Sequence, residues 1–357
     1  MDRQAVQGRR DAIGKYSSVF KRESTSCNGA CADDCTCAKS KIKAQASALI
    51  ESPESPRSES SLLTGQAVDE TSGAPTSPST PAVTFPLGSV LAELLAGYKE
   101  LNRLRKIFYC RKSLQCLFDD SQELKPSELT DFNDAMFQLW RVEPRLSVNF
   151  IASISYLRSL PDIEKTRMFS NFLLNFHAIE EPYLTWKFGG LTGDQKFWMM
   201  PNRVYLCFDK AEQYFDTPNI MRGLKLDKTS AINLFKPSFQ HAMETVGEKM
   251  ALMDLREVEV VGLIGVVLFD PTCRNLRPET ALLLNRLRNQ LFSDLLDYYR
   301  TEQFEEPEVR LGNLIILLQG VKIHAIKSKE NMELLRIFEI APLDNLFEEI
   351  VGISTPP

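Results

Sequence analysis

The chain has few of the features that enzyme active sites require. It contains three histidines in 357 residues, and none forms a His-x-x-x-His pair. It also has no glycine-rich loop of the kind that holds phosphates and no nucleophile elbow. Each histidine, at His177, His241 and His324, lies in a helical context without a partner motif, which is typical of a core or surface position. We therefore predict that the protein is not an enzyme.

Long apolar runs are missing as well. No stretch approaches the roughly 18 uninterrupted apolar residues of a membrane span. The first residues include Asp2, Arg3, Arg9 and Arg10 in place of the apolar segment of a signal peptide. The net charge of -5 argues against nucleic-acid binding by the whole chain. We expect a soluble, intracellular protein that contacts no membrane.

The eight cysteines include no paired Cys-x2-Cys motif, which most structural zinc sites use. Four of them lie close together in one polar segment: Cys27, Cys31, Cys35 and Cys37. Their spacing is irregular, and the segment has no large apolar residues to form a shell around a metal. The other four are scattered through apolar or mixed contexts, so we expect reduced thiols. We predict no metal site and no cofactor.

The composition divides the chain into three parts. Residues 1–22 mix basic and apolar residues with helical spacing. Residues 23–86 are rich in Ser, Thr, Pro, Glu and Gly and contain almost no aromatic residue. Such a segment buries too little apolar area to offset the entropy lost on ordering, so it is predicted to be a disordered hinge. Residues 87–357 are predicted to form one folded domain.

The pattern of residues 87–357 is almost entirely helical. Apolar residues recur at three- and four-residue steps in most segments, and residues 168–179 are apolar nearly all round, which indicates a helix buried in the middle of a domain. Residues 197–208 break the period around Pro201 and Asn202, which favours a small β-hairpin. We predict an all-α fold of stacked helical layers with this one hairpin.

The last predicted helix, Pro342–Gly352, is short and amphipathic. Its apolar residues fall on one face and its acidic residues on the other at about 3.6 residues per turn. An isolated helix of this length is marginal in water, so it must dock on another surface. One interpretation is a terminal helix packed on its own core. The other is a movable lid that completes a binding surface for a helix of another protein.

Four segments occur in the order expected of a nuclear hormone receptor ligand-binding domain. They are Ile154–Pro161, Val261–Pro271, Glu308–Leu318 and Leu346–Val351. Together they span most of residues 90–352, and their divergence resembles the expanded receptor families of nematodes. The resemblance implies a three-layer helical sandwich in residues 87–357. It also implies a nuclear transcriptional regulator.

Residues 1–14 resemble the extension that follows the second zinc module of these receptors, which makes residues 1–22 its expected remnant. The zinc modules themselves do not appear in the sequence. The resemblance therefore implies a receptor without its DNA-binding domain, either a shorter isoform or an incomplete sequence. DNA contact is then expected only indirectly, or through the missing N-terminal zinc-finger domain.

In this family the terminal helix and the third helix form a groove for a coregulator helix of the form Leu-x-x-Leu-Leu. By resemblance, Glu349 holds the N-terminal end of that helix and Arg158 holds its C-terminal end. Arg158 could equally be a solvated charge at a helix end. Ser170 stands where many relatives have a second basic residue. The apolar residues expected to seat the lid and line the groove are Leu346, Phe347, Ile350 and Val351.

The family also implies a pocket for a small lipophilic ligand and a dimer contact along residues 307–325, with an identical or a different receptor. The pocket candidates are Leu146, Asn149, Phe150, Ser153, Trp198 and Met199. Large side chains such as Phe150 and Phe172 could fill such a pocket, so an open and a filled pocket are both compatible with the sequence. Two alternatives of other classes stay open: an intracellular lipid-binding or carrier protein, and a helical scaffold without a transcriptional role.

Overall fold

The computed structural model describes residues 88–110, 113–119, 123–130, 132–192, 195–214, 228–337 and 345–351. All of them belong to one compact unit, Thr80–Pro357. The predicted N-terminal extension, the hinge and the cluster of four cysteines lie outside the described residues. Among the described residues, Cys110, Cys116, Cys207 and Cys273 form no disulfide bond.

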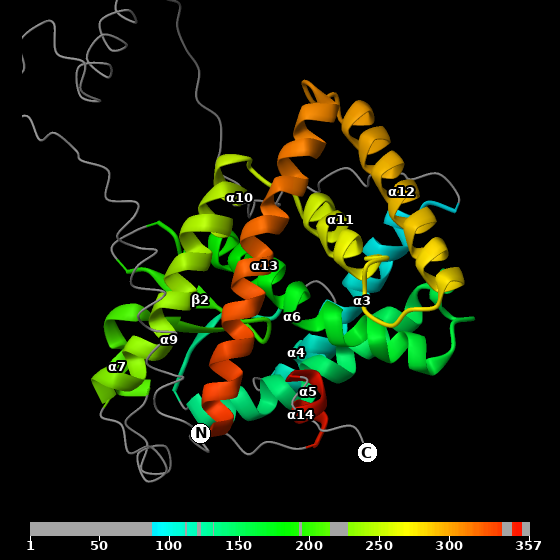
Figure 1. Ribbon diagram of the computed structural model, residues 1–357. Helices are drawn as coiled ribbons and strands as arrows, with labels where there is room; N and C mark the ends of the chain where they lie inside the picture. Colours follow the sequence, from blue (N-terminus) through cyan, green and yellow to red (C-terminus); the bar gives the residue numbers. More distant parts are fainter. Residues whose placement is uncertain are drawn as a thin grey trace, which may run out of the picture. The chain divides into compact units, whose positions relative to one another are not determined.

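Helices dominate the described residues, as the apolar periodicity predicts (Figure 1). The prolines at positions 144, 182 and 237 lie inside helices and do not end them. The helical segments are α3 (Val90–Tyr109), α4 (Leu114–Phe118), α5 (Phe132–Ser153), η1 (Ser155–Leu157), α6 (Asp162–Lys187), η2 (Phe208–Lys210), α7 (Ala211–Tyr214), α9 (Lys228–Ala242), the π-helical η3 (Met243–Gly247), α10 (Glu248–Leu252), α11 (Glu257–Leu268), α12 (Pro278–Thr301), α13 (Pro307–Ile337) and α14 (Asn345–Val351).

The helices form three layers around one large core. The middle layer consists of α6, α11 and α12, and it packs against α3 and α5 on one side and against α13 on the other. In Figure 1 the long orange α13 runs across the green α6, and α9 lies along α13. The middle of α6 is buried at Met168, Phe172, Phe176 and Ile179, which confirms its predicted place inside the domain. The fold class predicted from the sequence is therefore correct.

The small sheet is larger than predicted. The expected hairpin is present, with β2 (Phe197–Met199) antiparallel to β3 (Val204–Cys207). A third strand, β1 (Ser127–Glu128), pairs in parallel with β3, so the strand order is β1-β3-β2. Two residues are too few to produce a recognisable alternating pattern, which is why the sequence did not predict β1.

A buried acidic residue joins the three helices α11, α12 and α13. Both carboxylate oxygens of Glu259 in α11 accept hydrogen bonds from the Arg310 guanidinium in α13, at 2.7 and 2.8 Å. Glu259 also accepts from the Tyr299 hydroxyl of α12 at 2.9 Å and from the backbone N–H of Arg256. These bonds satisfy a carboxylate that would otherwise be costly to bury.

Among the described residues, one helix is long and apolar enough to cross a membrane by length and composition alone. This segment is Pro307–Leu334 of α13, with a mean hydropathy of 1.3. The window is not an uninterrupted apolar run, because polar residues separate its apolar ones, but few of its residues are charged. A single such helix is weak evidence, because core helices pass the same test, and α13 packs against α6, α9 and α12.

Candidate functional site

A cleft with a volume of about 320 Å³ lies where α5, α6 and α14 meet. Apolar side chains from all three helices contribute to its wall, and a few polar groups stand among them. Its lining residues are Val148, Ile151, Ala152, Asp162, Lys165, Thr166, Phe169, Ser170, Leu346, Glu349 and Ile350. An open, largely apolar groove between helices is the kind of site that accepts the apolar face of another helix.

The α14 helix borders this cleft and packs on α6 and α13. Ile350 is 6% exposed, whereas Leu346 is half-buried and Glu349 is exposed. This arrangement follows the amphipathic pattern of the sequence, since the apolar side turns inward and the acid outward. The side chains of Phe347 and Val351 lie outside what the structure describes. Three of the six predicted groove residues, Leu346, Glu349 and Ile350, thus come together at the cleft.

Three charged side chains line the cleft: Glu349 of α14, and Lys165 and Asp162 at the start of α6. The Lys165 ammonium lies 3.5 Å from the Asp162 carboxylate and donates a hydrogen bond to the carbonyl of Arg158 at 3.2 Å. About a third of the Lys165 side chain remains accessible, at 32%. Lys165 can therefore interact with a negatively polarised group in the cleft.

Arg158 has a different position from the one that the sequence suggested. It caps the C-terminal end of η1, its side chain is exposed, and it is not among the residues that line the cleft. Hydrogen bonds hold the turn that carries Arg158 to α3. Ser155 donates them from its backbone N–H and its hydroxyl to Glu93, at 2.9 and 2.6 Å. The basic side chain that lines the cleft is Lys165.

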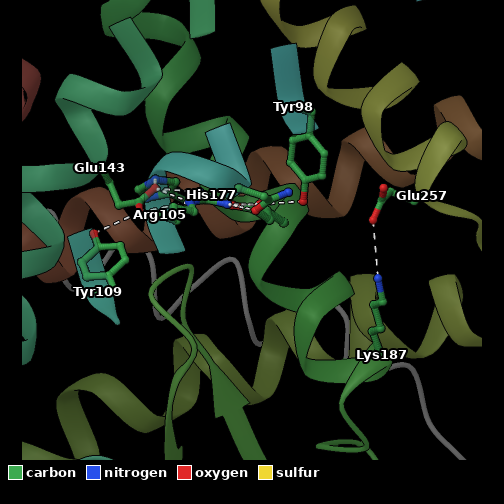
Figure 2. Close-up of polar contacts among 9 residues, drawn as sticks. Tyr98, Arg105, Tyr109, Glu143, His177, Lys187 and Glu257 are labelled. Carbon is green, nitrogen blue, oxygen red and sulfur yellow. Dashed lines mark hydrogen bonds and ion pairs between the residues drawn. The ribbon is translucent and has the colours of Figure 1, made fainter. Parts of the chain in front are cut away.

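A buried charge network joins α3 to α5 and α6, two of the helices that form the cleft (Figure 2). The Arg105 guanidinium of α3 donates to Glu143 of α5 and to Glu180 of α6, with the shortest bond to each carboxylate at 2.7 and 2.5 Å. Tyr98 donates to Glu180 at 2.7 Å and Tyr109 donates to Glu143 at 3.0 Å. The side chains of the three charged residues are at most 2% exposed.

The pKa values in this network show how tightly its charges are coupled. Burial by itself would lower the pKa of Arg105, but Glu143 and Glu180 outweigh burial and hold that pKa well above its ordinary value. Burial would likewise raise the pKa of Glu180, yet Arg105 keeps it below the ordinary value of 4.5. Burial, followed by the charge of Glu180, raises the pKa of Tyr98. All three groups therefore stay in one protonation state near neutral pH.

The network has a structural consequence for the cleft. Glu143 precedes Val148 by five residues and Ile151 by eight on α5, and Glu180 lies further along the same helix as Lys165 and Phe169. Because Arg105 binds both acids, it fixes α5 and α6 relative to each other. We conclude that the two walls of the cleft are held by a buried ion network, while α14 provides the third wall through apolar packing.

Comparison with known proteins identifies the family of the chain. Residues 120–338, more than half of the chain, match the model of the ligand-binding domain of nuclear hormone receptor. The chain belongs to the nuclear hormone receptor family. The receptor is 23% identical over 203 residues to nuclear hormone receptor family member nhr-28 of Caenorhabditis elegans, covering 55% of this chain and 45% of nhr-28.

Two further comparisons, one of sequence and one of structure, show how far the similarity extends. Nuclear hormone receptor family member nhr-86 of Caenorhabditis elegans is 21% identical over 267 residues, covering 74% of this receptor and 63% of nhr-86. The Ultraspiracle ligand binding domain from Drosophila melanogaster superimposes with a TM-score of 0.50 at 13% identity, over 76% of this chain and 99% of that domain. The receptor spans about half the length of the curated relatives that it matches.

The family assigns a general role to the domain. Nuclear hormone receptor domains of this kind are in general ligand-regulated and non-enzymatic, and they bind coregulators and dimerise. Among the described residues, no group of three or more His, Cys, Asp or Glu side chains is arranged to hold a metal ion.

The six candidates for the receptor's ligand pocket lie in different environments. Leu146, Phe150 and Met199 belong to the main core, whereas Trp198 belongs to a second cluster with Leu129, Leu139 and Phe208. Asn149 and Ser153 are exposed, on the surface of α5. Phe150 stacks with Phe172 and Phe176 at ring-centroid distances of 6.1 and 6.3 Å, so these rings occupy space between α5 and α6. The pocket assignment stays a prediction.

Sequence reasoning missed both Lys165 and the Arg105 network. A signal for the network exists in the sequence, because Arg105 follows Leu94, Tyr98 and Leu101 on the apolar face of one helix. A charge on an apolar stripe requires a buried partner. No comparable signal marks Lys165, whose position in the cleft depends on how α6 packs against α5 and α14.

Proposed function

We propose that this receptor regulates transcription in the nucleus by binding coregulator helices in the cleft between α5, α6 and α14. The proposal is based on the composition of that cleft. Its wall is mostly apolar, with the acid Glu349 on α14 and the base Lys165 on α6. A helix of the form Leu-x-x-Leu-Leu presents its three leucines at i, i+3 and i+4, which is one face. That face would cover Ile151, Phe169 and Ile350.

The two charges would orient the bound helix. The first turn of a helix has unpaired backbone N–H groups and a positive dipole end, which suits the exposed carboxylate of Glu349. The last turn has unpaired carbonyls and a negative end, which suits the ammonium of Lys165. In this proposal Lys165 takes the role that the resemblance gave to Arg158.

The test is a binding titration of the full chain with a fluorescein-labelled Leu-x-x-Leu-Leu peptide, followed by anisotropy. Glu349→Lys should weaken binding by about tenfold or more, because it replaces attraction at the helix N-terminus by repulsion. Glu348→Lys is the matched control, since Glu348 lies beside Glu349 on α14 but not in the cleft. Equal binding by the Glu349 variant and the parent would disprove the cleft assignment.

A small lipophilic ligand would act through α14 in this proposal. Such a ligand regulates the receptor only if it binds the state with α14 docked more tightly than the undocked state. Native mass spectrometry of the purified full chain tests whether a small molecule is retained. Retention of a lipid together with no peptide binding would instead favour the lipid-carrier alternative. Absence of both would favour the scaffold alternative.

The outer face of α13 supports a dimer contact. Val309, Ile316 and Ile323 are exposed to 53%, 68% and 40%, and they recur every seven residues along one face of the helix. Ile316→Asp should therefore convert a dimer to a monomer in sedimentation velocity experiments. A parent protein that is monomeric at micromolar concentration would contradict this part of the proposal. Sedimentation velocity of this receptor alone, and of its mixture with a second receptor, distinguishes a dimer of identical chains from a dimer with a different receptor.

A further inference from the structure

The helix α4 buries none of its five residues, which leaves apolar side chains in solvent. Leu114 is 75% exposed and Phe118 is 86% exposed. Single exposed apolar residues are ordinary, but here two lie on one short helix, and Leu117 beside them is only half-buried. Such an arrangement is better explained by contact with another molecule.

The apolar residues of α4 have the spacing of the helix proposed for the cleft. Leu114, Leu117 and Phe118 stand at i, i+3 and i+4, so they share one face. The helix is already capped, because the Ser113 hydroxyl accepts a hydrogen bond from the backbone N–H of Cys116 at 3.2 Å. A helix that is formed before binding loses less conformational entropy when it docks.

The charges that flank α4 complement the charges of the cleft. In the sequence, Arg111 and Lys112 precede the helix and Asp119 follows it. A helix with its N-terminal end at Glu349 and its C-terminal end at Lys165 would place basic residues near the acid and an acid near the base. The flanking charges and the helix dipole therefore favour the same orientation.

We propose that the cleft of one receptor binds α4 of a second copy of this chain. No residue of α4 lines the cleft of its own chain, although its apolar face is exposed. The proposal rests on the proposed function, because it uses the same cleft. An occupied cleft excludes a coregulator, so self-association through α4 would limit coregulator binding at high receptor concentration. Each copy carries one α4 and one cleft, so two copies can bind reciprocally.

The first experiment uses a labelled synthetic peptide of residues 109–122 and the full chain under reducing conditions. The peptide should bind, and an unlabelled Leu-x-x-Leu-Leu peptide should displace it. The same peptide with Leu114→Ala and Phe118→Ala should bind at least about tenfold more weakly, because both apolar anchors are lost. The receptor variant Glu349→Lys should weaken binding of the parent peptide, and Glu348→Lys should not.

The second experiment substitutes the two exposed residues of α4 in the full-length receptor. The double variant Leu114→Ala, Phe118→Ala should bind a coregulator peptide as well as the parent does at low receptor concentration, and better than the parent at high concentration. Leu252→Ala is the control, since Leu252 is 80% exposed on α10, away from both surfaces. The substituted residues are exposed, so circular dichroism should show an unchanged fold.

The outcomes separate this inference from the proposed function. If the Leu-x-x-Leu-Leu peptide binds and the α4 peptide does not, the inference is wrong and the proposed function stands. If neither binds, both fail. If the α4 peptide binds equally well to the Glu349 variant, it uses another surface and the inference is wrong. If the double variant gains coregulator binding at every receptor concentration, α4 occupies its own cleft and the second copy is excluded.

Discussion

The receptor has two groups of charged side chains near α5 and α6, one in the interior and one at the cleft, and they differ in exposure. In the interior, the side chains of Arg105, Glu143 and Glu180 are at most 2% exposed, and they bind one another. At the cleft, the side chain of Lys165 is 32% exposed and Glu349 is exposed. The interior charges pair with one another and hold the helices together. The charges at the cleft are accessible to a binding partner.

The largest expected effect comes from breaking the interior network. Arg105→Leu leaves Glu143 and Glu180 buried without their cation, and removal of one partner from a buried ion network costs about 3–5 kcal/mol. The free energy of unfolding in urea measures this loss. Arg103→Leu is the control, because Arg103 and Glu100 form an ion pair that is 48% and 42% exposed and such pairs contribute at most about 1 kcal/mol. Equal losses in the two variants would remove the distinction between the two regions.

Two glycines, Gly265 and Gly312, allow the same comparison of interior and surface for packing instead of charge. A Cβ at Gly265 in α11 would lie 2.4 Å from a Leu94 methyl carbon and 2.7 Å from one of Leu291. Gly265→Ala should therefore lower the free energy of unfolding by about 1–3 kcal/mol through overpacking. A Cβ at Gly312 in α13 meets nothing within 4 Å, so Gly312→Ala should raise stability by roughly 0.5–1 kcal/mol. The same sign for both substitutions in thermal unfolding would contradict the packing argument.

Acid should weaken the interior network by a smaller amount. The pKa of Glu180 is lower in the folded protein than its ordinary value of 4.5, because Arg105 outweighs the effect of burial. Its stabilisation is therefore complete above that ordinary value, and it is lost as the pH falls toward the folded-state pKa. Unfolding free energies from about pH 3 to pH 6 should decline on the acid side. Glu180→Gln should flatten that decline, and an unchanged slope in the variant would count against this assignment.

The smallest expected effect is at the edge of the cleft. Lys165→Glu should leave the free energy of unfolding nearly unchanged, because Lys165 is partly exposed and its ion pair with Asp162 is weak. It should weaken binding of a coregulator peptide by roughly threefold, and more at low salt, where charges are screened less. Lys99→Glu makes the same charge change on α3, outside the cleft, and should have no effect on binding. Salt-independent loss of binding would indicate a structural cause instead.

Most helices were predictable because the apolar period of each segment is a local property. The buried middle of α6 and the long α13 follow directly from their apolar residues. The strand β1 was not predictable, since its two residues form a strand only where β3 offers a partner. The cleft was predictable only in part. The amphipathic α14 identified Leu346, Glu349 and Ile350, whereas Lys165 depended on packing between helices.

Much of this receptor follows from its sequence alone. The helical periodicity, the all-α fold with its one hairpin, and the apolar face of the last helix depend on residues within a few positions of one another. Tertiary structure decided which charges are buried and which remain exposed. Arg105 meets Glu143 and Glu180 across 38 and 75 positions of the chain. Such a contact depends on which helix faces pack together, and this is a property of the whole domain.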